Sequence, residues 1–399
     1  MLTKNINFKN FSNLKKKIKI EKIFKNLKKN LSNKNDRLLF SLTNNYKYSF
    51  NANQLKKFKK YKFYNLIGMG GSILGAEAIY SFLKFKIKKN FFFIDNLIQK
   101  KTKPKKDKNL NIFISKSGNT LETISNLHSH NIKKHSVFIT EKKQNYLRNI
   151  ANKMKSEIFE HKNYIGGRYS VLSETGMLPA SLMGLDIKKF KRLNYLIKNK
   201  KFVNKLVENV SGIMSLYKKK KTNSIILNYD ENSQDLFNWY QQLVAESLGK
   251  KNKGILPIIS LVPKDNHSLM QLYLDGNKNN FFTFFLVEDK NTNKIKRKDL
   301  LDSHKYLGNK KTGDILAAQF YATQSVFKKK KIPFRSFVIK KRNEETLGEI
   351  FTFFILETIM LGKALNLNPF DQPAVELIKK ETYKILGKNY FPNIIFEVP

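Results

Sequence analysis

The sequence predicts an α/β fold in which two units each contain a parallel β-sheet flanked by helices. Short apolar stretches rich in β-branched and aromatic residues alternate with helical patterns along most of the chain. This alternation is typical of parallel sheets, because a parallel strand is reached through a crossover that is usually a helix. Two loops suited to ligands, one rich in glycine and one rich in hydroxyls, follow strands of the first unit, and such sheets bind ligands at the carboxyl ends of their strands.

The first unit is predicted over residues 61–185, after a basic, Asn-rich segment (residues 1–60) that we expect to form helices packed on a core built elsewhere. Its strands are expected at residues 63–67, 91–95, 111–114 and 136–140, because each is short and apolar. Helices are expected after the glycine-rich loop at residues 68–75, through about residue 83, and at residues 121–130. These strands and helices together predict a parallel sheet with helices on both faces.

The second unit is predicted over residues 224–343, beyond a Lys-rich helical connector at residues 186–223. Strands are expected at residues 224–229, 255–262, 281–288 and 335–340, and helices at 235–248, 267–274 and 314–327. The C-terminal residues 344–399 are predicted to be helical, with helices at 344–365 and 371–386 and a loop between them.

Composition limits the class of protein. A chain of 399 residues is long enough for two domains, and 41% hydrophobic residues with 32 Phe indicate a globular chain. There is no cysteine, which excludes disulfides and thiolate chemistry and suits a reducing compartment. The N-terminal residues lack the apolar core of a signal peptide, and no apolar run is long enough to span a bilayer. We therefore expect a cytoplasmic protein with no membrane association.

The formal net charge of +45 has two explanations. A nucleic-acid-binding protein would gather basic residues on one face and would favour Arg for bidentate contacts. In this chain Lys is spread from end to end, and Asn, Ile and Phe are also abundant. We interpret the charge as compositional drift rather than as specific nucleic-acid binding, with a positive field that attracts anions as a side effect.

The loop at residues 115–120 (SKSGNT) joins a predicted strand to a predicted helix. A helix N-terminus presents free backbone N–H groups and the positive end of the helix dipole, and the hydroxyls of Ser115, Ser117 and Thr120 add donors for a phosphate. The alternative is a Ser/Thr-rich helix cap without a ligand. The glycine-rich loop at residues 68–75 lies at the same sheet edge, which favours the phosphate site.

Three further segments carry candidate functional side chains. Arg168 lies between two glycines and an aromatic residue, where it is suited either to a ligand or to a surface turn. Gln242 and Glu246 are spaced i, i+4 and share one helix face. His267 is predicted at the start of a helix. The histidines show no spacing typical of a metal site, so no metal is expected.

Six motifs occur together in one order: GMGGSILGAEA (68–78), SKSGNTLET (115–123), GGRYSVLSETGMLP (166–179), QQLVAESLGK (241–250), DNHSLMQ (265–271) and NPFDQPAVELIK (368–379). In this combination the chain resembles the glucose-6-phosphate isomerases, of the shorter bacterial type, over about residues 65–380. The resemblance implies two sugar isomerase domains, each a parallel sheet flanked by helices, and C-terminal helices that reach back over the first domain.

The resemblance also implies roles for individual residues. Glu246 matches the base that moves a proton between C2 and C1, and Arg168 matches the arginine that stabilises the cis-enediolate. His267 and Lys379 match the pair that assists ring opening, with His267 supplied by the neighbouring subunit of a homodimer. The residues expected to bind the substrate are Gly71, Ser72, Ser115, Lys116, Ser117, Thr120, Gln242 and Gln372.

The expected reaction interconverts glucose 6-phosphate and fructose 6-phosphate and needs no cofactor, because a carbonyl moves between adjacent carbons by proton transfer alone. A guanidinium beside the enediolate stabilises the developing negative charge. Two alternatives remain open at this stage. One is an isomerase of broader specificity that also accepts mannose 6-phosphate, and the other is a non-catalytic sugar-phosphate-binding protein or a basic nucleic-acid-binding protein.

Overall fold

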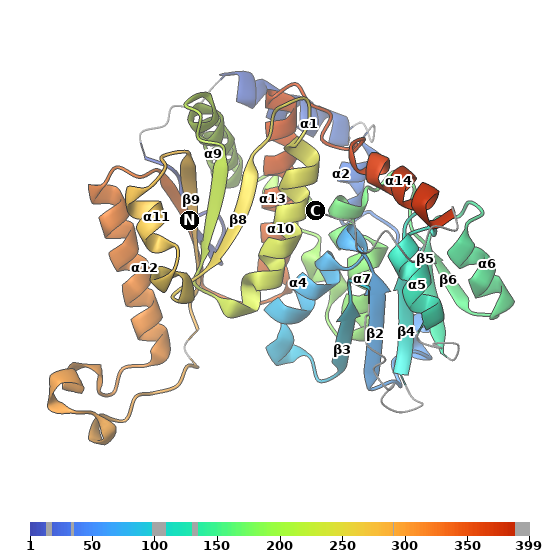
Figure 1. The fold of residues 1–399 in the computed structure, drawn as a ribbon, viewed down its shortest axis with the longest axis horizontal. Coiled ribbons are helices and arrows are strands. Elements are labelled where there is room, and N and C mark those ends of the chain that lie inside the picture. The colour runs from blue at the N-terminus through green and yellow to red at the C-terminus, as the bar shows by residue number, and fades with distance from the viewer. Residues whose placement is uncertain (13–17, 33–35, 98–108, 130–134, 290, 388–399) are drawn as a thin grey trace.

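The computed structural model describes residues 1–12, 18–32, 36–97, 109–129, 135–289 and 291–387 (Figure 1). Two five-stranded sheets lie side by side, and helices cover them and fill the space between them. The predicted fold class, two parallel sheets flanked by helices, is confirmed. Within the described residues, no helix is both long enough and apolar enough to cross a membrane.

The first sheet is parallel throughout, with strand order β3-β2-β4-β5-β6. Its strands are β2 (Phe63–Gly68), β3 (Asn90–Ile94), β4 (Asn109–Ile114), β5 (Ser136–Thr140) and β6 (Glu157–Glu160). Four of them lie within one or two residues of the predicted strands. The fifth, β6, was not predicted, because four residues of sequence EIFE carry charge at both ends and no clear alternation.

The second sheet has strand order β1-β10-β9-β7-β8 and is parallel except for β1. Its strands are β1 (Ile6–Lys9), β7 (Asn223–Asn228), β8 (Leu256–Leu261), β9 (Asn280–Val287) and β10 (Phe334–Ile339). Strand β1 pairs antiparallel with β10, with Ile6 opposite Ile339. The N-terminal segment therefore contributes an edge strand as well as the predicted helices.

The helices predicted within the two units and in the C-terminal region are present near their predicted bounds, whereas α6 (Tyr146–Lys153) was not predicted. The α-helices are α1 (Ile18–Ser32), α2 (Arg37–Ser41), α3 (Ala52–Lys56), α4 (Leu74–Phe82), α5 (Leu121–Ser129), α6 (Tyr146–Lys153), α7 (Glu174–Leu182), α8 (Leu193–Leu196), α9 (Lys200–Lys218), α10 (Gln234–Leu248), α11 (Met270–Asp275), α12 (Thr312–Lys329), α13 (Glu344–Ala364) and α14 (Val375–Gly387). The short 3-10 helices that bear on the site are η1 (Gly70–Ser72), η3 (Gly167–Leu172), η4 (Ile187–Phe190) and η6 (Lys264–His267).

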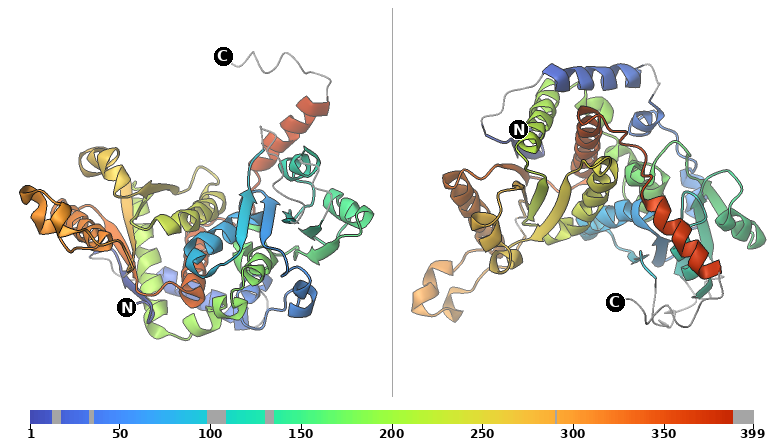
Figure 2. Two further views of the ribbon diagram at one scale, coloured as in Figure 1. Left: turned by 90° about the horizontal axis from the view of Figure 1, so that it is seen from below. Right: turned by 45° about the horizontal axis from the view of Figure 1, so that its top comes forward.

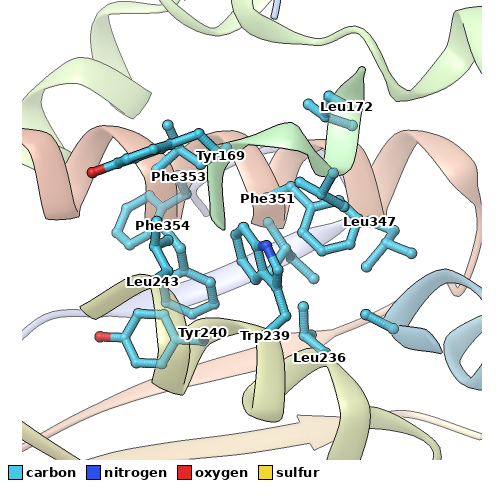
Figure 3. Close-up of a cluster of buried hydrophobic side chains, with 14 of the residues drawn as sticks. Tyr169, Leu172, Leu236, Trp239, Tyr240, Leu243, Leu347, Phe351, Phe353 and Phe354 are labelled. Carbon is cyan, nitrogen blue, oxygen red and sulfur yellow. The ribbon is translucent and has the colours of Figure 1, made fainter. Parts of the chain in front are cut away.

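The central core joins the two sheet units. Helix α13 is buried along almost its whole length, and α10 packs against it. Trp239 of α10 meets Phe351 of α13 edge to face, with 4.7 Å between ring centroids. Figure 3 shows Tyr169 and Leu172 of η3 beside the same aromatic cluster. The 3-10 helix η3 is thus fixed between α10 and α13, because aromatic side chains of this size fill the space on both sides.

A fully buried ion pair between Arg335 and Glu357 also contacts α10, through Tyr240. The guanidinium of Arg335 on β10 donates to the Glu357 carboxylate on α13, and both side chains are 0% exposed. Tyr240 of α10 donates its hydroxyl to Glu357 Oε1 over 3.0 Å. Arg335 Nε donates to Thr283 Oγ1 at 2.9 Å. Because every charged group has partners, the network ties α10 to the second sheet at low cost.

Helix α14 differs from the other long helices. None of its residues is buried, and apolar side chains such as Leu377 and Ile378 are 66% and 71% exposed. Figure 2 shows α14 projecting from the body beside the first sheet unit. Its contact with that unit includes a hydrogen bond from the Tyr383 hydroxyl to the Asn119 carbonyl oxygen at 3.2 Å.

Candidate active site

The glycine-rich loop and the hydroxyl-rich loop lie side by side at the carboxyl edge of the first sheet. They follow β2 and β4, which are paired so that Gly68 lies opposite Ile114. A Cβ at position 68 would lie 2.8 Å from the Ile114 carbonyl oxygen and 3.2 Å from Ser72 Cβ. The loops therefore approach each other closely only because residue 68 has no side chain.

The hydroxyl-rich loop is closed by its own side chains. Ser115, which is buried, has its Oγ 2.8 Å from Thr120 Oγ1. The backbone N–H of Gly118 donates to Ser115 Oγ at 3.1 Å, and the N–H of Asn119 donates to Ser117 Oγ at 3.2 Å. Gly118 has φ +66°, a conformation that favours glycine. This compact turn presents hydroxyls directly before α5, the arrangement expected of an anion site.

Lys116 points away from this turn in the described conformation. Its Nζ donates to the Asn163 carbonyl oxygen at 2.7 Å and lies 3.7 Å from Glu141 Oε1. Burial lowers the pKa of Lys116, and the Glu141 carboxylate opposes that shift. The ammonium of Lys116 is therefore directed at Asn163 and Glu141 rather than at the hydroxyls of the loop.

The glycine-rich loop is packed against η3. A Cβ at Gly71 would lie 2.2 Å from the carbonyl carbon of Gly167, so no side chain fits there. Ser170 Oγ lies between two carbonyl oxygens, 2.6 Å from that of Gly167 and 3.2 Å from that of Gly71. Gly70 adopts φ +51°, and a Cβ there would lie 2.7 Å from Gln242 Nε2. The glycine-rich loop thus lies against the Arg168 backbone at Gly71 and against the Gln242 side chain at Gly70.

Arg168 is the centre of the site. Its side chain is 1% exposed, and all five of its N–H groups have acceptors. Nε donates to Ser247 Oγ at 2.8 Å. Nη2 donates to two backbone carbonyl oxygens, of Pro369 at 2.7 Å and Asp371 at 3.0 Å. Nη1 donates to side chains instead, to Glu246 Oε2 at 3.0 Å and Gln372 Oε1 at 2.8 Å.

Glu246 lies on the last turn of α10. Its Oε1 accepts a hydrogen bond from Gln242 Nε2 at 2.8 Å, as the i, i+4 spacing predicts, and its Oε2 accepts from Arg168. The Glu246 side chain is 31% exposed, in contrast to that of Arg168. The carboxylate is therefore fixed on two sides while part of it remains open to a ligand.

His267 and Lys379 lie apart from these contacts. His267 is exposed at the end of the 3-10 helix η6, whereas the sequence predicted that it opens an α-helix. The next α-helix, α11, begins at Met270. Lys379 lies on α14 with its side chain 59% exposed, and its Nζ bonds Glu376 Oε1 at 2.6 Å on the same helix. The structure thus brings together Arg168, Glu246, Gln242 and Gln372, but not His267 or Lys379.

Three residues that support Arg168 were missed by the sequence analysis: Ser247, Lys250 and Asp371. Ser247 accepts from Arg168 and lies 2.8 Å from the Tyr169 hydroxyl. Lys250 bonds Asp371 Oδ1 at 2.6 Å, which fixes the loop whose carbonyl oxygens hold Arg168. All three belong to quoted motifs, AESLGK and NPFDQ, so a signal was present. Nothing in their residue types indicated which would contact Arg168.

The architecture defines the class of protein as an α/β protein with two parallel sheets flanked by helices. The fold resembles a hypothetical protein of Thermus thermophilus, with TM-score 0.74 and 24% identity over 84% of this chain and 87% of the other. It also resembles a glucose-6-phosphate isomerase of Chlamydia trachomatis, with TM-score 0.68 and 20% identity over 87% of this chain and 74% of the other.

Sequence comparison gives the family. A family model described as phosphoglucose isomerase matches residues 50–255. The glucose-6-phosphate isomerase of Methanocaldococcus jannaschii is 32% identical, covering 85% of this chain and 88% of that protein. That of Mycoplasmopsis pulmonis is 33% identical, covering 81% and 82%. The chain belongs to the phosphoglucose isomerase family. The predictions of this family and of an isomerase are confirmed.

Proposed function

We propose that this protein interconverts glucose 6-phosphate and fructose 6-phosphate through a cis-enediolate. The observation that carries the proposal is the contact between Arg168 and Glu246, which combines a fixed positive charge with a partly exposed carboxylate. Relatives that are about one third identical bear the name glucose-6-phosphate isomerase, which supports the same substrates here. The two groups are those that an aldose–ketose isomerisation by proton transfer requires.

In the proposed mechanism Glu246 takes the proton from one carbon and returns it to the adjacent one. Gln242 donates a hydrogen bond to one carboxylate oxygen of Glu246, and Arg168 donates one to the other. The two bonds together fix the orientation of the carboxylate. A fixed orientation of the base lowers the entropic part of the barrier. Gln242 and Gln372 flank the carboxylate and the guanidinium, where their amide groups are suited to sugar hydroxyls.

Arg168 would stabilise the negative charge that develops on the enediolate oxygen. Its Nη2 is held by two backbone carbonyl oxygens, whereas the partners of Nη1 are the side chains of Glu246 and Gln372. Side chains can rotate and give up a hydrogen bond more easily than backbone can move. We therefore assign Nη1 as the donor to the enediolate, with Nε and Nη2 anchoring the guanidinium in position.

The phosphate of the substrate is assigned to the hydroxyl-rich loop, with Ser115, Ser117 and Thr120 as donors and Lys116 beside them. The support is the position of these hydroxyls directly before α5, next to the glycine-rich loop that carries Gly71 and Ser72. A phosphate held there would supply binding energy remote from the reacting carbons. Binding at a fixed point also keeps the sugar in register with Glu246.

Ring opening is assigned to His267 and Lys379, and the proposal includes a homodimer in which His267 enters the site of the partner. The exposure of both side chains in a single chain is consistent with roles that need a second subunit or a bound substrate. The chain contains no cysteine and therefore needs no oxidising compartment, which supports the proposal of a cytoplasmic location.

The direct test is a coupled assay in which purified protein converts fructose 6-phosphate into glucose 6-phosphate, detected by NADP reduction through a glucose-6-phosphate dehydrogenase. Activity at protein concentrations far below that of the substrate is the expected result. A purified, folded protein without activity would refute the proposal and favour a non-catalytic sugar-phosphate-binding protein. The same assay with mannose 6-phosphate, through added coupling enzymes, tests the broader specificity.

A further inference from the structure

Two charged side chains are buried beside η3, the segment that carries Arg168. Lys191 follows η4 and is 6% exposed, and Glu174 is the first residue of α7 and is 0% exposed. Among the described residues, neither side chain contacts one that is assigned to the substrate. We propose that Lys191 and Glu174 are positioning residues, which fix the 3-10 helix η3 and through it the guanidinium of Arg168. The proposal rests on the catalytic role proposed for Arg168.

The Lys191 ammonium donates hydrogen bonds to backbone carbonyl oxygens of two separate elements. Its Nζ donates to the carbonyl oxygen of Leu172, the last residue of η3, and to that of Ser41, the last residue of α2. The ring centroids of Tyr46 and Tyr48 lie 4.6 Å and 5.0 Å from Nζ. Carbonyl oxygens and aromatic faces are the partners that a desolvated ammonium prefers when no carboxylate touches it.

The Glu174 carboxylate is bonded to the same N-terminal segment as Lys191. Its Oε2 accepts a hydrogen bond from the Tyr46 hydroxyl at 2.8 Å, and its Oε1 accepts one from the backbone N–H of Ser49 at 2.9 Å. Tyr46 therefore contacts both charges, with its ring over Lys191 and its hydroxyl on Glu174. The N-terminal segment from Ser41 to Ser49 links the end of η3 to the start of α7 through these two side chains.

A displacement at the end of η3 would reach Arg168, because the intervening residues are tightly bonded. The Ser170 carbonyl oxygen accepts from Thr175 Oγ1 at 2.9 Å, and Ser170 Oγ lies 3.2 Å from the Gly71 carbonyl oxygen. A Cβ at Gly176 would lie 2.0 Å from the Val171 carbonyl oxygen, so α7 leaves η3 no free space. A rigid support of this kind matters, because a shift of about 1 Å at a catalytic group can cost about 100-fold in rate.

The competing explanation is that the two charges stabilise the fold without affecting catalysis. A loss of stability lowers the melting temperature, but well below that temperature it leaves the kcat of the folded molecules unchanged. A displaced Arg168 instead lowers kcat, since the enediolate exists only during reaction, and leaves phosphate binding at the hydroxyl-rich loop intact. A fall in kcat with unchanged phosphate binding therefore indicates a displaced Arg168, and a fall in melting temperature alone indicates a loss of stability.

The experiment compares four variants by kcat, by inhibition with inorganic phosphate and by melting temperature. Lys191→Met removes the donor but keeps the length of the side chain, so that the buried space stays filled. Tyr46→Phe keeps the ring over Lys191 and removes only the hydroxyl on Glu174. Phe138→Leu creates a cavity in the first sheet as a stability control, and Arg168→Lys is the reference for loss of the guanidinium.

The expected result is a kcat lowered about 10- to 100-fold in Lys191→Met and about 3- to 10-fold in Tyr46→Phe, with phosphate inhibition within about twofold of the parent. Phe138→Leu should keep the parental kcat. If Lys191→Met does not fold, Tyr46→Phe decides the matter. Parental kcat in the variants at 191 and 46, with a low kcat in Arg168→Lys, overturns this proposal alone. Parental kcat in Arg168→Lys overturns the role proposed for Arg168 as well.

Discussion

Arg168 Nη1 lies 3.0 Å from Glu246 Oε2, although the two residues belong to different sheet units and are separated by 78 positions in the sequence. The arginine side chain is 1% exposed and the glutamate side chain 31%. A buried guanidinium with every donor engaged is a rigid reference point, and the more exposed carboxylate is oriented against it. Substitutions of the base, of the two loops and of the residue expected from a second subunit should therefore change kcat, KM or activity in different ways.

Glu246→Gln should remove the base and keep the shape of the site. The amide still offers an oxygen to Arg168, so substrate affinity should change little, while kcat should fall by about 10²- to 10⁴-fold, as is typical for loss of a general base. Steady-state kinetics with fructose 6-phosphate and inhibition by inorganic phosphate measure the two effects. If the variant retains more than about a tenth of the parental kcat, Glu246 is not the base.

Gly71→Ala should displace η3. The added Cβ would lie 2.2 Å from the Gly167 carbonyl carbon and 2.5 Å from the Arg168 backbone nitrogen, which forces the two backbones apart. We expect kcat to fall at least about 10-fold, because Arg168 moves with η3. Gly167→Ala is the matched control, since a Cβ at that position would find its nearest neighbour at 3.7 Å. Equal kcat in the two variants would show that the contact does not position Arg168.

Much of the fold could be predicted from the sequence, because buried parallel strands carry a strong local signal. Strand β5, for example, has the predicted bounds, because its central residues VFI are apolar and mostly β-branched, as is typical of a strand buried on both faces. Strand β1 could not be predicted in the same way. Its position depends on pairing with β10, more than 300 residues away, and four residues of sequence INFK do not specify a partner.

Some residues of the candidate site could be predicted from the sequence, and others could not. The resemblance carried by the motifs identified Arg168 and Glu246 as site residues, whereas their contact became known only from the structure. The pair Lys191 and Glu174 was missed, because a lysine in the stretch KKFKRL has the pattern of a solvated surface. Its burial results from Tyr46 and Tyr48, which are distant in sequence. The sequence contains no period or spacing that relates these residues.

Combined replacement of Ser115→Ala and Thr120→Val should weaken substrate binding. The two hydroxyls lie 2.8 Å apart at the start of α5, where they would contact a phosphate that does not react. Hydrogen bonds to charged groups contribute about 1.5–3 kcal/mol each, so KM should rise at least about 10-fold. Ser136→Ala is a suitable control, because the Ser136 hydroxyl is buried without a partner among the described residues. A fall in kcat with unchanged KM would contradict the assignment.

The stability of the protein should depend on pH through Glu77 of α4. Burial, with Asp95 and Asp235 nearby, raises the pKa of Glu77 from 4.5 to about 8. Between these two pH values the folded state holds a proton on Glu77 that the unfolded state has lost. The stability that protonated Glu77 contributes is therefore complete below pH 4.5 and is lost as the pH rises through about 8. Glu77→Gln should abolish this loss.

The measurement for Glu77 is the melting temperature of parent and variant at about pH 5 and about pH 9. The advantage of Glu77→Gln over the parent should grow by several degrees at the higher pH, because the parent must then bury a carboxylate near two others. Glu231→Gln, at an exposed position, controls for the general effect of removing a negative charge. A difference between parent and Glu77→Gln that is the same at both pH values would mean that Glu77 does not titrate in this range.

The homodimer proposed for the active site predicts complementation between inactive subunits. Each site would combine Arg168 and Glu246 of one chain with His267 of the other. In a heterodimer of His267→Ala and Glu246→Gln, one site carries both changes and the other carries neither. Random association makes half of the dimers heterodimers, each with one intact site of two, so about a quarter of the parental activity should return.

The two variants are mixed by co-expression, or by denaturation and refolding together, because subunits of a stable dimer exchange slowly. Isomerase activity of the mixture is compared with that of each variant refolded alone, and native mass spectrometry confirms the heterodimers. His267 is exposed at the end of η6 in a single chain, so it is free to reach a neighbouring subunit. Heterodimers without recovered activity would mean that His267 acts within its own chain or has no part in the reaction.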